Sequence, residues 1–209
     1  MTGSIKMCKL DYLTMKTQTS SYFALGFIII LFSCMNASII SLTFSTSWFT
    51  AMLSNQIFMI HEKGDLGRFY HSLSLELKDI VQGRYLFLFT NYFICLLLTL
   101  IIGSIFALYR HTPLAPLDLL TATASSLLVF TVINGVQLPL YFKFGYTKAK
   151  ISSLLAPLIV IAIFYCGTSG ILPFLYSPSL FIILSFLLSI LIIMISCHLS
   201  VFGYKTGKR

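Results

Sequence analysis

Charged residues stand in a few short groups along this chain, and long apolar runs separate these groups. Four of the runs contain no Asp, Glu, Lys or Arg, and they cover residues 17–61, 85–109, 119–142 and 151–204. About 20 apolar residues in a helix cross the hydrocarbon core of a bilayer. The runs therefore predict helices that span a membrane, and they constrain the fold more than any motif does.

The lengths of the runs predict six spans. The first and last runs are each long enough for two spans joined by a short turn, and each central run holds one span. We expect turns near residues 35–38 and 167–170, because asparagine, serine and paired glycines favour turns. The predicted fold is an all-α membrane protein in which residues 1–209 form a single transmembrane domain. Its expected spans cover residues 18–37, 39–60, 85–109, 118–141, 152–167 and 180–202.

The composition agrees with this fold. Hydrophobic residues make up 57% of the chain and charged residues 10%, against roughly 25% charged residues in a soluble domain. A soluble domain of 209 residues cannot bury so much apolar surface, so a soluble enzyme is excluded. The five cysteines form no C-x-x-C pair, and they predict neither a disulfide framework nor a zinc site.

The basic residues predict the orientation. In a six-span arrangement, 13 of the 14 Lys and Arg residues fall on one side, and Arg110 alone falls on the other. Lys and Arg are enriched in the cytoplasmic loops of membrane proteins. We therefore expect both termini and the loops 61–84 and 142–150 to be cytoplasmic, and the outer loops to be very short.

The N-terminal segment, residues 1–17, has a helical pattern. One helical face gathers less polar residues, and lysines cluster on a neighbouring face, which predicts a helix that lies on the inner membrane surface. The alternative is a plain basic flank before the first span. The residues expected on the less polar face are Ile5, Cys8, Tyr12 and Met15.

The loop 61–84 is predicted to contain a second surface helix, near residues 72–82. Ser72 or Ser74 is suited to cap its N-terminus, and Gly83 is expected to bend the chain into the third span. A short charged helix between two membrane hairpins favours docking to a partner over catalysis.

No catalytic site is expected in this chain. The G-T-S-G sequence at 167–170 resembles the turn of intramembrane serine proteases, whose serine needs a base within hydrogen-bond reach. Ser169 is expected in an outer loop and His198 near the inner face, roughly 27 Å away at 1.5 Å per residue. No P-loop sequence occurs, and the scattered basic residues do not favour nucleic-acid binding.

Two cytoplasmic segments resemble small ABC-2-type permeases. Residues 66–87, LGRFYHSLSLELKDIVQGRYLF, resemble the segment that leads into the third span of that family, and residues 139–146, PLYFKFGY, resemble the segment that closes the fourth span. Residues 9–12, KLDY, match more weakly. The chain departs from the family pattern at Ser74, where proline is frequent, and at Leu77, where arginine is frequent.

The resemblance implies the membrane subunit of an ABC exporter in a bacterial cytoplasmic (inner) membrane. A separate ABC ATPase subunit would bind and hydrolyse ATP with Mg²⁺, so this chain would need no cofactor. A second permease subunit, identical or related, would complete the pathway, and the helix near 72–82 would be the coupling helix. The residues implied as ATPase contacts are Ser72, Leu75, Lys78, Asp79, Ile80 and Arg84.

Alternatives to these assignments stay open. The implied contact residues could pack against neighbouring segments of their own chain, and Arg84 could extend to the membrane interface and fix the start of the third span. The expected substrate is amphipathic or hydrophobic, such as a peptide, toxin or drug. Rival functions are an ion-coupled secondary carrier or channel, and a membrane scaffold or immunity protein that transports nothing. The absence of Asp, Glu, Lys and Arg deep in the predicted spans counts against proton coupling.

Overall fold

The computed structural model describes residues 3–16, 19–35, 38–64, 76–111, 115–153, 155–158, 160 and 177–206. Over these residues it contains helices and no strand, which confirms the all-α prediction. The helices are α1 (Gly3–Met15), α2 (Thr19–Cys34), α3 (Ile39–Lys63), α5 (Leu77–Tyr109), α6 (Pro116–Phe144), α7 (Tyr146–Ser153) and α9 (Pro178–Thr206).

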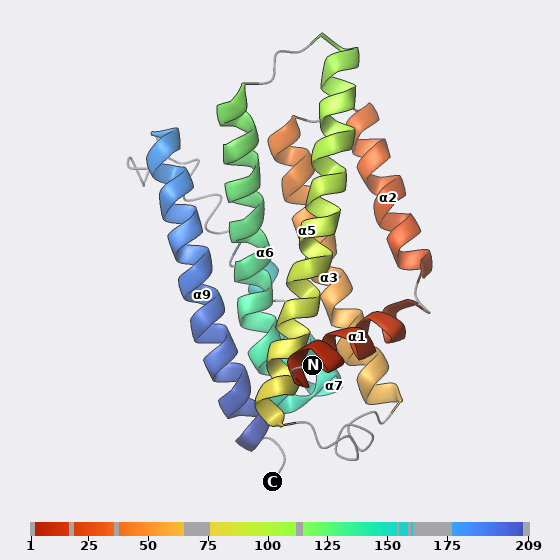
Figure 1. Cartoon of the computed structure of the whole chain (residues 1–209), viewed down its shortest axis with the longest axis vertical. Coiled ribbons are helices and arrows are strands. Elements are labelled where there is room, and N and C mark those ends of the chain that lie inside the picture. The colour runs from red at the N-terminus through yellow and green to blue at the C-terminus, as the bar shows by residue number, and fades with distance from the viewer. Residues whose placement is uncertain are drawn as a thin grey trace.

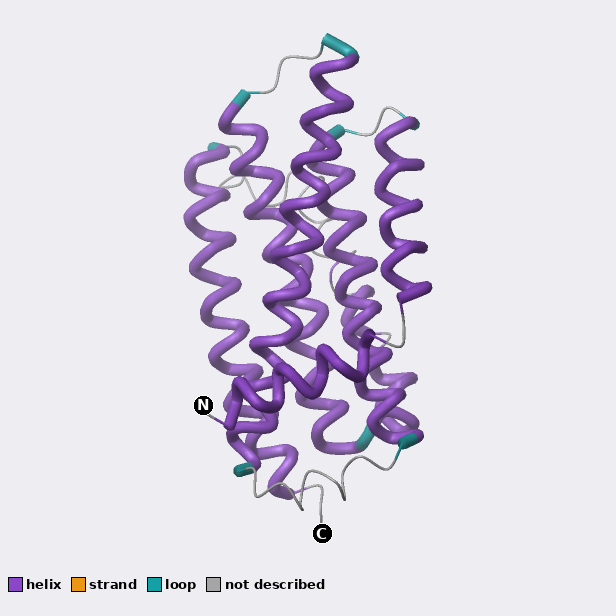
Figure 2. Tube along the Cα trace, turned by 45° about the vertical axis from the view of Figure 1, so that its right-hand side comes forward, coloured by secondary structure: helices purple, strands orange, loops and turns teal. Residues whose placement is uncertain are grey.

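The long helices run side by side along the longest axis of the molecule, whereas α1 crosses them near one end (Figure 1). Both termini, α1 and α7 lie at this same end, which we call the basal end, and Figure 2 shows the same arrangement from another side. The basal end also holds the start of α5 and the end of α3. The described parts of the segments predicted to be cytoplasmic therefore lie together in the fold.

The predicted spans compare with the helices as follows. Spans one, two, three, four and six coincide with α2, α3, α5, α6 and α9. Most of the predicted fifth span and the turn at 167–170 lie outside the described residues. In the described part of the chain, three helices are long and apolar enough to cross a membrane, namely α5, α6 and α9. The pair α1–α2, bent by 80°, counts as a fourth if it is taken as one span. The count of six spans therefore stays a prediction.

Local signals account for several helix ends. Ser38 caps α3 by accepting a hydrogen bond from the Ser41 amide at 3.3 Å, and Pro116 occupies the first turn of α6, where its missing N–H costs nothing. At the end opposite the basal end, Arg110 donates hydrogen bonds from Nη2 to the carbonyl oxygens of Ser33 and Cys34, at 2.7 and 2.9 Å. The only basic residue expected on the outer side therefore caps the C-terminus of α2, where a cation is favourable.

Small side chains let α9 approach α6 closely. The buried face of α9 consists of four serines and one glycine, whereas large apolar side chains such as Leu187 and Leu191 are exposed on its other faces. Ser189 accepts a hydrogen bond from Thr131 of α6 at 3.3 Å. This pattern is typical of helices that pack within a membrane, where small residues bring backbones together. The buried residues of α9 are Ser185, Ser189, Ser196, Ser200 and Gly203.

The predicted separate helix at 72–82 and the bend at Gly83 are wrong for the described residues. Residues 77–82 form the first turns of α5, which continues through Gly83 without interruption. The N-cap is Glu76, whose side chain makes no capping hydrogen bond, while residues 72–75 lie outside the described part. Gly83 serves a close helix approach and not a turn, because a Cβ there would lie 2.5 Å from Cβ of Met7.

Candidate functional site

The first turns of α5 are covered by α1, which packs across them at the basal end (Figure 1). The Ser4 hydroxyl donates a hydrogen bond to Oδ1 of Asp79 at 2.9 Å. One turn further along α1, Met7 is fully buried against Ile80. The two segments are more than 70 residues apart in sequence, so α1 is held by tertiary contacts and not by chain connectivity.

Gly83 allows this contact. A Cβ at this position would lie 2.6 Å from the carbonyl oxygen of Ser4 and 2.5 Å from the Met7 Cβ. The first of these atoms belongs to the backbone of α1, which a change of rotamer cannot move. The two helix backbones therefore come close together only because position 83 has no side chain.

A buried ion pair joins α1 to α5 beyond Gly83. Nε of Arg84 lies 3.7 Å from Oδ2 of Asp11, and the side chains of Arg84 and Asp11 are 3% and 1% exposed. Both Asp11 oxygens and the Nε and Nη2 atoms of Arg84 make no hydrogen bond. Burial raises the pKa of the Asp11 carboxyl to about 6, while the Arg84 charge acts in the opposite direction.

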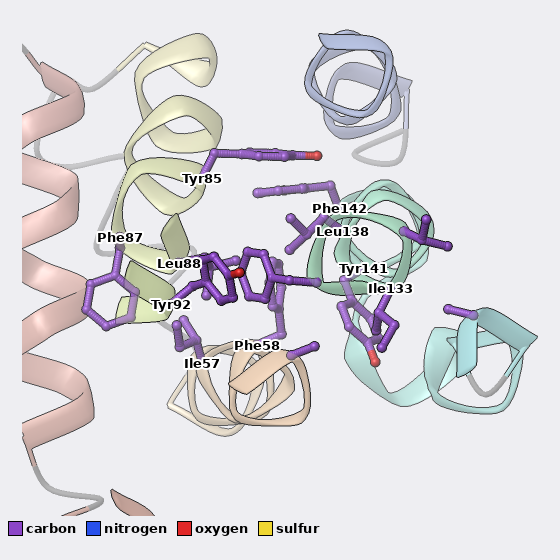
Figure 3. Close-up of a cluster of buried hydrophobic side chains, with 14 of the residues drawn as sticks. Ile57, Phe58, Tyr85, Phe87, Leu88, Tyr92, Ile133, Leu138, Tyr141 and Phe142 are labelled. Carbon is purple, nitrogen blue, oxygen red and sulfur yellow. The ribbon is translucent and has the colours of Figure 1, made fainter. Parts of the chain in front are cut away.

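Aromatic rings from two further helices surround the guanidinium. Its Cζ atom lies 4.5 Å from the ring centre of Phe58 on α3 and 5.7 Å from that of Phe142 on α6. These two rings meet edge to face, with their centres 5.2 Å apart. Figure 3 shows both rings in the space between α3, α5 and α6. Arg84 thereby contacts α1, α3 and α6 from its own position on α5, and cation–π attraction favours its charge there.

Tyr85, the next residue of α5, links this region to α9. Its hydroxyl lies 2.5 Å from Oγ of Ser196 and 2.9 Å from Oγ of Ser200, and Figure 3 shows the ring reaching from α5 toward α9. Arg84 and Tyr85 together connect the start of α5 with every other long helix except α2.

A second contact at the basal end joins α3 to α7. Glu62, near the end of α3, accepts hydrogen bonds from the Thr147 amide at 3.0 Å and from the Thr147 hydroxyl. Partial burial alone would raise the pKa of Glu62, but these bonds and the nearby Lys148 outweigh burial and lower it. The carboxylate caps the N-terminus of α7, just after Gly145 turns the chain with φ 78°.

The interior between α3, α5 and α6 carries hydroxyl groups. Ser126 of α6 lies 2.6 Å from Ser47 and 2.7 Å from the Tyr92 hydroxyl, and Thr99 donates to Thr46 at 3.0 Å. Of the predicted intramembrane amides, Asn134 donates to the Phe130 carbonyl within its own helix at 3.0 Å. The hydroxyl groups bond one another across the helices, as polar side chains do in a membrane, whereas the Asn134 amide bonds within α6.

The residues implied as ATPase contacts fall into three groups. Lys78 is exposed, whereas Ser72 and Leu75 lie outside the described residues. Asp79, Ile80 and Arg84 contact α1 or the bundle interior in this structure, as in the alternative that they pack against their own chain. The other alternative for Arg84, extension to the membrane interface, is wrong, because its side chain is buried. Their role toward an ATPase stays a prediction.

The N-terminal helix is present, and it buries a second face in the bundle besides the less polar face that is expected to lie on the membrane; Met15 belongs to both. Met7, Asp11 and Met15 are buried, whereas Ile5 and Tyr12 are 43% and 63% exposed. Asp11 was not expected on a buried face, because its partner charge is 73 positions away in the sequence. Positions 7, 11 and 15 are four residues apart and so share one helical face. The aspartate at position 11 makes this face look polar, and the sequence therefore does not indicate its burial.

Within the described residues, no group of three or more His, Cys, Asp or Glu side chains is placed to hold a metal ion.

Comparison with known proteins gives one match. The sequence profile of the ABC-2 family transporter proteins matches residues 6–205, which include most of α1, the start of α5 and the Asp11–Arg84 pair. No curated protein and no solved structure matches the chain. The profile covers nearly the whole chain and agrees with the helical, apolar structure, so this protein belongs to the ABC-2 transporter family and is a multi-pass membrane permease that is not itself catalytic.

Proposed function

We propose that this permease is the membrane subunit of an ATP-driven exporter in a bacterial cytoplasmic membrane. Its family implies an ABC ATPase as partner, and in our proposal that subunit binds and hydrolyses ATP with Mg²⁺. Two permease subunits, identical or related, enclose the pathway. The substrates are amphipathic or hydrophobic molecules such as peptides, toxins or drugs.

The observation that carries this proposal is the continuity of α5. The helix contains 33 residues and is about 50 Å long at 1.5 Å per residue. It begins at the basal end within the segment 66–87, which resembles the family's segment leading into the third span. A displacement of its first turns is therefore passed along one rigid helix, and Arg84 passes it to α3 and α6.

The proposed mechanism is a two-state shift. Closure of the ATPase dimer on ATP pushes the segment 65–78 and tilts α5, which favours one of two arrangements of the spans. ATP acts only to the extent that it binds one arrangement better than the other. In the proposal Leu75 and Lys78 contact the ATPase, while Asp79, Ile80 and Arg84 transmit the movement to α1 and the bundle.

The exposed surface supports the substrate class. The outer faces of α2, α5 and α9 carry large apolar side chains, including Phe27, Leu97 and Leu191. A substrate that passes between two such subunits meets apolar walls and lipid. Amphipathic molecules fit this combination better than sugars or ions do.

A first experiment tests whether Leu75 and Lys78 contact the ATPase. The double variant Leu75→Asp, Lys78→Glu should insert normally but retain much less ATPase when the complex is purified from membranes. Lys205→Glu, which reverses another exposed charge at the basal end, is the matched control and should retain the ATPase. Full retention by the double variant would move the proposed contact to the loop 142–150.

A second experiment tests the energy source. Inverted membrane vesicles that contain the complex should accumulate an amphipathic peptide when ATP is added, and an ATPase variant without its catalytic glutamate should abolish this uptake. Uptake that follows an ion gradient without ATP would support a secondary carrier. An absence of uptake and of substrate-stimulated ATP hydrolysis would support a scaffold or immunity protein.

A further inference from the structure

We propose that Asp11 and Arg84 are positioning residues that lock α1 to the first turns of α5, so that the two helices move as one body during transport. The inference rests on the proposed function, since it concerns how movement at the start of α5 is passed on. It assigns α1 a mechanical role beyond that of a helix lying on the membrane surface.

The contact between the helices extends over about two turns of α1 and about one and a half turns of α5. A hydrogen bond lies at the start of α1, apolar packing over a glycine lies in the middle, and an ion pair lies toward its end. These positions advance together along both helices, so α1 cannot slide along α5 without breaking all of them. The pairs, in order, are Ser4–Asp79, Met7–Gly83 and Asp11–Arg84.

The ion pair is the unusual member of this set. Asp11 and Arg84 are the only charged side chains that are buried among the described residues. Replacing a buried ion pair with apolar residues of similar size is often neutral or stabilising, so stability alone does not account for it. A buried pair does fix which surfaces meet, because any other register leaves a charge without a partner.

The contacts of Arg84 also determine to which helices α1 is attached. Its guanidinium contacts the rings of Phe58 on α3 and Phe142 on α6. The pair therefore ties α1 to the point where α3, α5 and α6 meet. On its other side, α1 exposes Ile5, Tyr12 and Leu13, an apolar surface suited to the membrane interface. As part of this unit, α1 carries the movement of α5 into the plane of the membrane surface.

The central experiment removes both charges without leaving either one alone. The double variant Asp11→Leu, Arg84→Met keeps side chains of similar length and should fold and bind the ATPase. In the reconstituted complex, peptide transported per ATP hydrolysed should fall by about tenfold. A pair that only stabilises the fold would leave this ratio unchanged, so a ratio within about twofold of the wild type would overturn the proposal.

Hydrogen exchange on the same samples gives a measurement that does not depend on transport. Amides of α1 should exchange about tenfold faster in the double variant, because an apolar pair does not hold α1 in a single register on α5 and the helix separates from it more often, while amides of α6 should be unaffected. If the α1 amides of the double variant exchanged at the wild-type rate, the proposal that the ion pair holds α1 on α5 would be overturned. If the wild-type complex shows no ATP-dependent transport, the proposed function fails, and exchange alone then decides about the lock.

A reversible cross-link tests movement as one body. In a variant without natural cysteines, Ser4→Cys and Asp79→Cys place two thiols where the side chains already touch. Oxidation should leave transport within about twofold of the reduced sample, because the tethered helices do not separate in the cycle. Loss of transport on oxidation, recovered on reduction, would show that α1 and α5 move relative to each other and would overturn the proposal.

Discussion

A glycine such as Gly83 can either bend the chain or let two helices approach closely, and the sequence alone does not distinguish these two functions. In the chain order Gly83 stands between a charged segment and an apolar run, so a bend is the natural expectation. In the structure it lies inside a straight helix and is needed because the backbone of α1 passes over it.

The first prediction follows from this approach. Gly83→Ala should destabilise the protein by about 1–3 kcal/mol, because the added methyl group forces α1 away from α5. Thermal unfolding of the detergent-purified protein measures the change. Gly26→Ala is the matched control, since a Cβ at position 26 meets nothing within 4 Å, and alanine there should be neutral or slightly stabilising. Equal melting temperatures for the two variants would contradict this account.

The second prediction concerns the pH dependence of the Glu62 cap. Its pKa is lowered in the folded protein, so the stabilisation is present above the unfolded pKa of 4.5 and is lost as the pH falls through the lower, folded value. Exchange of the α7 amides should therefore accelerate as the pH falls through this range, beyond the intrinsic pH effect. Glu62→Gln should exchange faster already at pH 7, without this added acid dependence. An unchanged acid response in Glu62→Gln would contradict the assignment.

The burial of Asp11 could not be predicted from the residues around it in the sequence. Its burial depends on Arg84, which is 73 positions away, and no local pattern reports that the two meet. The apolar positions that surround Arg84 belong to α3 and α6, so the pocket exists only after four helices have packed.

At the scale of elements, the helices could be predicted well and their interfaces could not. Charge spacing located α2, α3, α6 and α9 to within a few residues, because each apolar run must form a helix in lipid. For α5 the sequence predicts a separate helix at 72–82, a bend at Gly83 and a span from residue 85, whereas one helix runs from Leu77 to Tyr109. Arg84 is in fact accommodated inside the bundle by tertiary contacts.

The third prediction tests the interface between α9 and α6. Ser189 is fully buried, and Ser189→Leu should separate the two helices and lower the stability by about 1–3 kcal/mol. Ser179→Leu makes the same change at an exposed position of α9 and should have little effect. Unfolding followed by circular dichroism in mixed micelles compares the two variants. A melting temperature for Ser189→Leu equal to that of Ser179→Leu would show that the serine face of α9 is not closely packed.

At the scale of the whole molecule, the fold separates the two ends by charge. The basic residues of the described helices gather at the basal end, while Arg110 at the other end is engaged with the carbonyl groups of α2. Both termini lie at the basal end (Figure 2). This arrangement agrees with a cytoplasmic basal end under the bias of Lys and Arg in membrane proteins.

The fourth prediction tests this orientation. In a variant without natural cysteines, Lys205→Cys should resist a membrane-impermeant thiol reagent in intact cells. Thr112→Cys and Ser169→Cys, which lie outside the described residues and are predicted to be in outer loops, should react. Permeabilised cells are the control in which all three react. Labelling of position 205 from outside would overturn both the orientation and the six-span count.

The position of Arg84 along α5 has a consequence for the size of the movements. It stands seven residues after the first residue of the helix and 25 before the last, which correspond to arms of about 10 Å and about 37 Å. If α5 rocks about the point where Arg84 is held by three other helices, it acts as an unequal lever. A push of about 1 Å at the basal end then swings the far end by between 3 and 4 Å, by the ratio of those arms. In the proposed exporter, a small displacement at the basal end would thus be enough to open the pathway at the opposite end.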